Sequence, residues 1–265
     1  MKTVFLEKPI SLRPSDITEN TSFIVKKDLG NEFAVTINGD WKSSTFSDRA
    51  DGLFPWPAIH VECEYQSKGV LLNRIDNADI TAIRVHESRG CGVELRSVRQ
   101  SQINSIRVHR AKSDDLIVRI DGIDNADASN MILIGQLSCM ACDAPVTVSI
   151  EGTGKNSPRV ITISQLILHV VVDRIREQFP PMANVGGRKR VHVRVLDRSA
   201  AVTIVSGNLR LDPADMDGSK AIEMASTCRD IVMLNGQILK AKYGEDVVSM
   251  VDGGLKVIPW AGDSN

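Results

Sequence analysis

Arginine and histidine recur at a fixed spacing in two closely similar segments of the chain. The word IRVH occurs at residues 83–86 and again at 106–109, so Arg84 and His86 return as Arg107 and His109. A guanidinium group presents a planar fork of donors that suits carboxylate or phosphate, and an imidazole ring both donates and accepts hydrogen bonds. These residue types would suit a surface that binds an anionic or polyhydroxylated chain, and they also occur on ordinary solvated sheet faces.

Further copies of the segment extend this pattern along most of the sequence. The copies carry an apolar residue at every second position and begin at Ile59, Ile83, Ile106, Leu137, Leu166, Leu209 and Leu239. Because side chains in a strand alternate between two faces, the residues between the apolar positions form two outward columns. The first column reads His60, Arg84, Arg107, Ser138, Ile167, Arg210 and Lys240. The second column reads Glu62, His86, His109, Met140, His169, Asp212 and Lys242.

Nine polar residues of these columns form what we term the candidate ligand ladder. They are His60, Glu62, Arg84, His86, Arg107, His109, His169, Arg210 and Asp212. One interpretation of the ladder is an elongated binding groove. The other is an ordinary solvated sheet face, on which Glu62 and Asp212 partly balance the basic residues.

A basic loop is expected at residues 173–190, the longest insertion between copies. Its cationic residues are Arg174, Arg176, Arg188, Lys189 and Arg190. Loops often carry recognition on a rigid scaffold, so this loop is a candidate contact for an acidic partner. It fits a solvated excursion equally well.

The two columns contain no carboxylate pair suited to catalysis. Glycoside hydrolysis needs two carboxyl groups a few ångströms apart, whereas four other copies separate Glu62 from Asp212. Asp114 and Asp115 are adjacent, but they precede a strand at a corner, where a turn explains them. Nucleophile-elbow, P-loop and metalloprotease motifs are also missing. We therefore expect no catalytic residues; an enzyme on this sequence would be a polysaccharide lyase or hydrolase.

The five cysteines are sparse and odd in number, which predicts buried thiols in a reducing compartment. Cys139 and Cys142 have the spacing of a metal or redox pair, but no second pair or adjacent histidine accompanies them. In a strand, residues three apart should also point to opposite faces. We expect no metal and no cofactor.

The overall composition is typical of a globular protein, with 42% hydrophobic residues and a net charge of −1. This charge gives no reason to expect a nucleic-acid partner. The N-terminus lacks the apolar run of a signal peptide, and no run approaches the length of a membrane span. Aromatic residues are only 4%, so Val, Ile and Leu must fill the core, which suits a narrow and regular one.

Alternating strand-like segments lie between the copies, at residues 69–72, 92–98, 146–150, 191–195 and 246–251. Polar corners rich in Asp, Asn and Ser then lead into the next copy. A repeating strand with loops of variable length is the signature of a solenoid. A leucine-rich repeat is the competing solenoid, but it would place Asn or Cys where Ser88 and Ala111 stand.

The pattern over about residues 58–250 resembles the parallel β-helix of the pectin-lyase-like superfamily. The resemblance implies an all-β, single-stranded, right-handed parallel β-helix of about seven coils, with irregular N- and C-terminal caps. We expect a cap and irregular first coil at residues 1–57 and the β-helix with its C-terminal cap at 58–265. The predicted core includes Ile83, Val85, Ile106, Val108, Leu166 and Leu168.

The resemblance is nearest in style to tailspike and other virion proteins of tailed bacteriophages. It implies a non-enzymatic structural or receptor-binding protein of the tailspike, tail-fibre or decoration type, assembled in the host cytoplasm into the virion. Its partners would be other virion proteins or further copies of itself, for instance in a trimer, and an anionic surface polysaccharide. The alternative function is that of a lyase or hydrolase acting on such a polysaccharide.

Overall fold

The computed structural model describes residues 1–39, 56–122, 130–152, 159–170, 190–196, 200–210, 220–225, 232–234, 236–238, 248–249 and 256–258. Within these ranges the chain forms strands and turns, together with one 3-10 turn, η1 (Pro14–Asp16). None of the described helical structure is long and apolar enough to cross a membrane.

The strands form two sheets in which all pairings are parallel. The first sheet contains β1 (Lys2–Leu6), β3 (Thr21–Val25), β5 (Ile59–Glu62), β8 (Ile83–His86), β10 (Arg99–His109), β12 (Asn130–Cys142), β14 (Arg159–Val170), β16 (Ala200–Arg210), β18 (Val232–Leu234) and β21 (Lys256–Ile258), with β7 (Asp79–Ile80) and β19 (Gly236–Ile238) beside β10 and β16. The second sheet contains β2 (Ile10–Leu12), β4 (Phe33–Asn38), β6 (Lys68–Asn73), β9 (Val93–Arg96), β11 (Leu116–Gly122), β13 (Val146–Gly152), β15 (Val191–Val195), β17 (Lys220–Met224) and β20 (Val248–Ser249).

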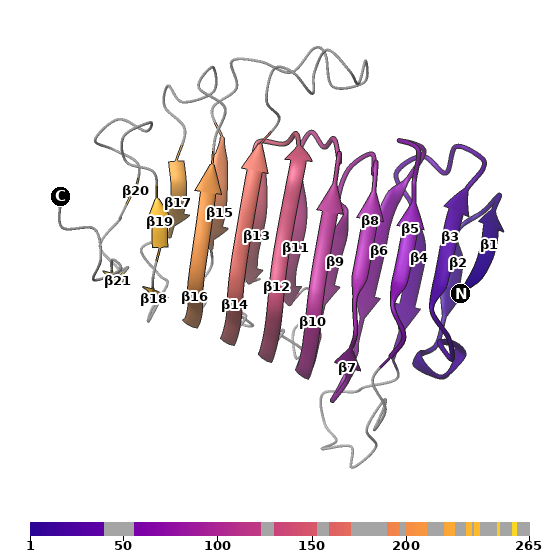
Figure 1. Cartoon of the computed structure of the whole chain (residues 1–265), viewed down its shortest axis with the longest axis horizontal. Helices are drawn as coiled ribbons and strands as arrows, with labels where there is room; N and C mark the ends of the chain where they lie inside the picture. Colours follow the sequence, from indigo (N-terminus) through magenta and orange to yellow (C-terminus); the bar gives the residue numbers. More distant parts are fainter. Residues whose placement is uncertain are drawn as a thin grey trace.

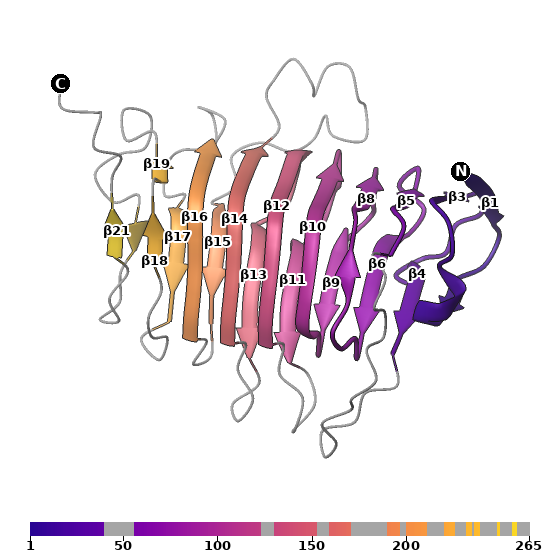
Figure 2. The same ribbon diagram turned by 60° about the horizontal axis from the view of Figure 1, so that its bottom comes forward.

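The chain visits the two sheets alternately and advances along one axis as it does so. In Figure 1 the strands succeed one another in sequence colour, and the arrows of the two sheets point in opposite directions. Figure 2 shows the second sheet, with β4, β6, β9, β11 and β13, stacked in the same order. Each strand therefore has as neighbours the strands one turn before and one turn after it. This is a parallel β solenoid, as the repeat predicted.

Inward side chains of the first sheet form continuous apolar ladders. Ile59, Ile83, Ile106, Leu137 and Leu166 are aligned in register, and each is at most 1% exposed. A second ladder joins Val61 and Val85 to Val108, Cys139 and Leu168. The six residues predicted to lie in the core are all buried. The sequence prediction of the core is confirmed.

The second sheet closes this core from the other side. Val70, Val93, Val118, Val148 and Val193 form one of its ladders, and all are fully buried. Four of the five alternating segments expected between copies correspond to β6, β9, β13 and β15, and the fifth overlaps β20. A leucine-rich repeat would have a helix or an irregular arc where this chain has a second strand. Of the two solenoids considered, the structure therefore agrees with the β solenoid.

The N-terminal residues 1–39 are more regular than expected. β1 and β3 pair in parallel and lead directly into β5, while β2 and β4 lead into β6. Four strands within the expected cap therefore continue the same two sheets. The segment around residues 40–55 and the C-terminal cap around Trp260 lie outside the described residues.

Several corners of the described chain contain a non-glycine residue in the left-handed conformation. Glu87, Arg110 and Ala141 have φ of 55°, 56° and 54° and directly follow aligned positions of β8, β10 and β12. A single residue of positive φ reverses the usual alternation of side chains. This conformation is strained for residues with a Cβ. The hydrogen-bonded strands on either side must therefore stabilise it.

One expectation about the cysteines was wrong for this reason. Cys139 and Cys142 both belong to the hydrophobic core, although they are three residues apart in one strand. The left-handed residue Ala141 lies between them and turns Cys142 back inward. Cys63, Cys91, Cys139 and Cys142 are all free and buried, as predicted. Burial raises the pKa of Cys63 and of Cys142 to about 12; Cys228 lies outside the described residues.

Candidate functional site

The candidate ligand ladder lies on the outer face of the first sheet. Strand register places His60, Arg84 and Arg107 in one column and Glu62, His86 and His109 in the next. Arg84 and Arg107 are exposed, and the four others are partly buried. The sequence therefore predicted correctly which of these residues are neighbours.

The second column contains a compact Glu–His cluster. Glu62 Oε1 lies 2.6 Å from His86 Nδ1, and the His86 and His109 rings are 4.9 Å apart between centroids. Burial lowers the pKa of His60 and of His109, and at His60 the nearby Glu62 carboxylate opposes that shift. Glu87, which the sequence did not single out, brings a third possible metal donor to Glu62 and His86.

Arg107 of the first column contacts a neighbouring column of uncharged polar side chains, in which Ser105, Gln136 and Gln165 are aligned. Arg107 Nε donates to Gln136 Oε1 at 3.1 Å, and Gln136 Nε2 donates to Gln165 Oε1 at 2.7 Å. These contacts run across three neighbouring rungs. They are consistent with either interpretation of the ladder.

At the C-terminal end of the ladder the predicted register was wrong by two residues. Leu168, rather than Leu166, pairs with Leu209, so Arg210 stands beside His169 in the second column. The residue that pairs with Leu166 is the buried Gly207, two residues before Leu209. The next copy is displaced by one residue, since Leu209 pairs with Ile238 rather than Leu239. Asp212 lies outside the described residues.

The basic loop is described only at its last residue. Arg190 is 1% exposed, and its Nη1 lies 2.7 Å from Oδ1 of the buried Asp143 and 3.0 Å from the carbonyl oxygen of Ala144. Arg190 therefore fixes the entry to β15 and does not project toward a partner, which corrects the expectation for this residue. Arg174, Arg176, Arg188 and Lys189 lie outside the described residues.

A pocket of about 620 Å³ lies where the chain enters the second sheet, at the start of β6, β9 and β11. Its lining includes four basic residues, Lys68, Arg89, Lys112 and Arg119, and three acidic ones, Glu94, Asp114 and Asp115. Cys91 and Leu116 contribute an apolar surface, as part of a small cluster with Val146. The volume is within the range of small-molecule sites, roughly 300–1,000 Å³.

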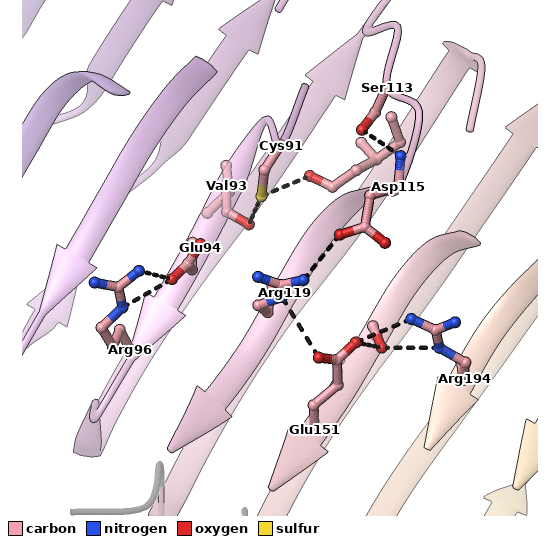
Figure 3. Close-up of polar contacts among 11 residues, drawn as sticks. Cys91, Val93, Glu94, Arg96, Ser113, Asp115, Arg119, Glu151 and Arg194 are labelled. Carbon is pink, nitrogen blue, oxygen red and sulfur yellow. Dashed lines mark hydrogen bonds and ion pairs between the residues drawn. The ribbon is translucent and has the colours of Figure 1, made fainter. Parts of the chain in front are cut away.

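Ion pairs connect three charged residues of the pocket, Glu94, Asp115 and Arg119, with one another or with charged residues farther along the second sheet (Figure 3). Arg119 Nη2 lies 2.9 Å from Asp115 Oδ2, and its Nε lies 3.6 Å from Glu151 Oε2. Arg96 binds Glu94 through two nitrogens, at 2.5 and 2.8 Å. Arg194 Nη2 lies 3.1 Å from Glu151 Oε1, which also accepts from Ser149. The outer face of the second sheet is therefore an ordered array of alternating charges.

Two carboxylates of this array stand in register on neighbouring rungs. Asp121 of β11 pairs with Glu151 of β13, and Arg96 of β9 is the other neighbour of Asp121. Burial raises the pKa of Asp121 to about 7, with Glu94 and Glu151 acting in the same direction and Arg96 and Arg119 against it. A carboxyl group with such a pKa can exchange a proton near neutral pH.

This pair was not predicted from the sequence, because outward columns were expected only on the first strand of each coil. The same alternation applied to the segments VELR, VRID and VSIE at 93–96, 118–121 and 148–151 would have aligned Asp121 with Glu151. Asp114 and Asp115, expected to form a turn, do lie just before β11, and both are exposed at the pocket.

No family model, no curated protein and no solved structure matches this chain. The chemistry must therefore be inferred from the site. The pocket combines cations, anions and an apolar surface, which suits a ligand that is both anionic and hydroxylated.

Proposed function

We propose that the protein is a receptor-binding or structural β-helix that binds an anionic polysaccharide, and that the pocket at the start of β6, β9 and β11 holds one acidic sugar unit. The observation that carries this proposal is the lining of the pocket: four basic and three acidic side chains around an apolar surface. Lysine and arginine suit the carboxylate of an acidic sugar, and carboxylates accept hydrogen bonds from its hydroxyl groups.

The charges of the pocket differ in how firmly they are held. Arg119 and Arg89 are paired with Asp115 and Asp28, at 2.9 and 2.5 Å. The Lys68 ammonium lies 5.3 Å from the centroid of the Phe33 ring. A lysine held against a ring can turn toward a ligand at lower cost than an arginine already paired with a carboxylate. Lys68 is therefore the residue to test first, together with Lys112, the other lysine of the lining.

The finer architecture belongs to the same proposal: a right-handed coil of about seven turns, as in the pectin-lyase-like superfamily, within a virion protein of tailspike, tail-fibre or decoration type. The alternating parallel sheets support a coil of this kind. Self-association into a trimer would appear as three chain masses in light scattering of the full chain. The genes beside its own should then encode other virion proteins.

The binding proposal is tested by two double variants that each remove two positive charges. Lys68→Gln with Lys112→Gln alters the pocket, and Arg84→Gln with Arg107→Gln alters the candidate ligand ladder. Affinity for polygalacturonate should fall roughly 10–1000-fold in the pocket variant, at about 1–2 kcal/mol for each charged contact. The ladder variant should bind within about threefold of the parent, because its net charge change is the same but its charges lie elsewhere.

Other outcomes of this experiment are equally informative. A loss confined to the ladder variant would move the binding site to the first sheet, onto Arg84 and Arg107. Unchanged binding in both variants, or equal binding to a neutral dextran, would overturn the proposal of an anionic ligand. Binding should also weaken with added salt, since charged contacts at a partly exposed site are screened.

A second candidate function is cleavage of the same polysaccharide. The observation that favours it is the pair formed by Asp121 and Glu151 on adjacent rungs, whose backbones are separated by roughly 4.7–4.9 Å in a parallel sheet. Retaining glycosidases use two carboxyl groups about 5–5.5 Å apart, one of them with a raised pKa. Release of reducing ends or unsaturated products, lost in Glu151→Gln, would support catalysis; intact polymer after prolonged incubation would exclude it for that substrate.

A further inference from the structure

Three metal-donor groups converge at the carboxyl ends of β5 and β8 in the first sheet, away from the charged array of the second sheet. The donor atoms of Glu62, His86 and Glu87 all lie within 4.8 Å of one another. Glu62 Oε1 is 2.6 Å from His86 Nδ1, and Glu87 Oε1 is 4.0 Å from the same nitrogen. The three side chains are 19–27% exposed, so they are partly dehydrated and still reachable from solvent.

The solenoid itself explains why these residues meet. Parallel register stacks Glu62 on His86, one rung apart. Glu87 follows His86 directly and would point to the opposite face of a regular strand. Its φ of 55° reverses that alternation and brings its carboxylate back toward His86. The strand register and the backbone conformation of Glu87 therefore bring the three side chains together.

The distances fit a small tetrahedral ion. Zinc binds imidazole and carboxylate at about 2.0–2.2 Å, so two ligand atoms in a tetrahedral site lie roughly 3.3 Å apart. The two distances to His86 Nδ1, 2.6 and 4.0 Å, lie on either side of that value. Shifts of about 0.7 Å, within the reach of side-chain rotation, would make both of them fit. One imidazole with two carboxylates favours zinc-class ions over calcium, which prefers an all-oxygen shell of six to eight ligands.

Two neighbouring side chains bear on the strength of the site. Arg110 Nη1 lies 3.2 Å from Glu87 Oε1 and competes with an ion for that carboxylate. The His109 ring lies against His86, with 4.9 Å between centroids and an interplanar angle of 31°, and restricts how the His86 ring can turn. An ion bound at Nδ1 would leave the ring hydrogen of His86 on Nε2.

We propose that Glu62, His86 and Glu87 form a binding site for one divalent ion of the zinc class on the outer face of the first sheet. No metal was expected from the sequence, because the cysteines lack a second pair and strand alternation places Glu87 on the opposite face from Glu62 and His86. The inference stands independently of the polysaccharide proposal, since it involves other residues and another sheet.

The test is calorimetric titration of the full chain, freed of metal, with zinc chloride, followed by cobalt as a spectroscopic probe. One zinc per chain should bind, and cobalt should give the intense visible absorption of a tetrahedral site. His86→Gln and Glu62→Gln should each weaken zinc binding at least about tenfold. His169→Gln is the matched control: it removes a partly buried histidine of the same column, two rungs beyond His109, and should leave affinity unchanged.

Arg110→Gln provides a test that a merely structural cluster would not pass. Removing the cation that pairs with Glu87 should strengthen zinc binding severalfold, because the carboxylate becomes available to the ion. Circular dichroism verifies that each variant retains the sheet. The proposal is overturned if the wild-type chain binds no zinc saturably, if folded His86→Gln binds as tightly as the wild type, or if Arg110→Gln fails to bind more tightly.

Discussion

Charged residues of this protein occur in two settings. Some are buried as an ion pair, and others lie among further charges on the outer face of the second sheet. Arg190 and Asp143 are almost fully buried and joined at 2.7 Å, at the corner before β15. Asp121 is 4% exposed and surrounded by both acidic and basic neighbours. Each situation leads to a prediction about stability.

Breaking the buried ion pair should cost more than removing it. Asp143→Leu leaves the Arg190 guanidinium buried without its carboxylate, and should lower the free energy of unfolding by about 3–5 kcal/mol. Arg190→Leu should have a similar effect, because a carboxylate is then buried alone. The double variant should recover part of that loss. A double-mutant cycle in urea denaturation measures the coupling; strictly additive losses would contradict the prediction.

Asp121 should make the protein less stable as the pH rises. Its pKa in the folded state is about 7 against an ordinary value of 3.8, so the folded chain holds a proton that the unfolded chain has released. Stability from this group is fully present below about pH 4, falls between about pH 4 and 7, and is lost above that, by up to roughly 4 kcal/mol.

The measurement is urea denaturation at several pH values between 4 and 8. Asp121→Asn should flatten the decline seen in the parent and be the more stable of the two at pH 8. The same substitution at the exposed Asp114 serves as control and should leave the slope unchanged. An identical pH dependence in the parent and Asp121→Asn would refute the assignment.

At two glycines of this fold, neighbouring strands pack so closely that a Cβ atom would not fit. A Cβ added at Gly69 would lie 2.1 Å from the carbonyl oxygen of Gly92 and 2.6 Å from Val85. A Cβ added at Gly92 would meet chiefly the Val108 side chain, at 2.6 and 3.1 Å. The first clash involves backbone and cannot relax, whereas the second involves a side chain that can be shortened.

These two glycines should therefore respond differently to repacking. Gly69→Ala should lower the free energy of unfolding by about 3 kcal/mol or more, at the upper end of the range for overpacking, and Val85→Ala should not restore it. Gly92→Ala should also destabilise, but Val108→Ala should cost less in that variant than in the parent, because it removes the clash as well as a contact. Thermal denaturation of the two cycles distinguishes them; equal rescue at both sites would contradict the structure.

The whole molecule is a stack in which each rung contacts mainly its neighbours, so position along the axis matters. Val108 lies between Val85 and Cys139 in the core ladder, with rungs on both sides. Val4, on β1, pairs with Phe23 of β3 and is only partly buried. The same polar substitution should therefore have very different effects at the two places.

Val108→Asp should destabilise severely, by more than about 4 kcal/mol, since it buries an unpaired charge in a narrow core. Val4→Asp should cost about 1 kcal/mol, because its carboxylate can reach water and only one rung is disturbed. Denaturation followed by circular dichroism gives both values. Similar losses at the two positions would mean that the stack unfolds as a single unit with no dependence on position.

The sequence by itself determined the solenoid, its buried ladders and the neighbours within each outward column from residue 58 to about 140. It could do so because strand alternation has a strict period of two, and the repeated IRVH word fixes register once two copies are aligned. Where the copies weaken, as at Leu209, a two-residue shift keeps the same face inward, and alternation alone could not detect it.

Only the tertiary structure decided which functional groups meet. Glu87 reaches Glu62, and Cys142 turns into the core, because single residues of positive φ reverse the alternation, and apart from glycine many residue types adopt that conformation here. The pocket joins residues from four successive coils, and Arg190 forms a buried ion pair with a residue of the preceding coil. Such contacts depend on the path of each loop between two strands. Loop lengths differ from coil to coil, and the residue pattern does not predict which residues of neighbouring loops come together.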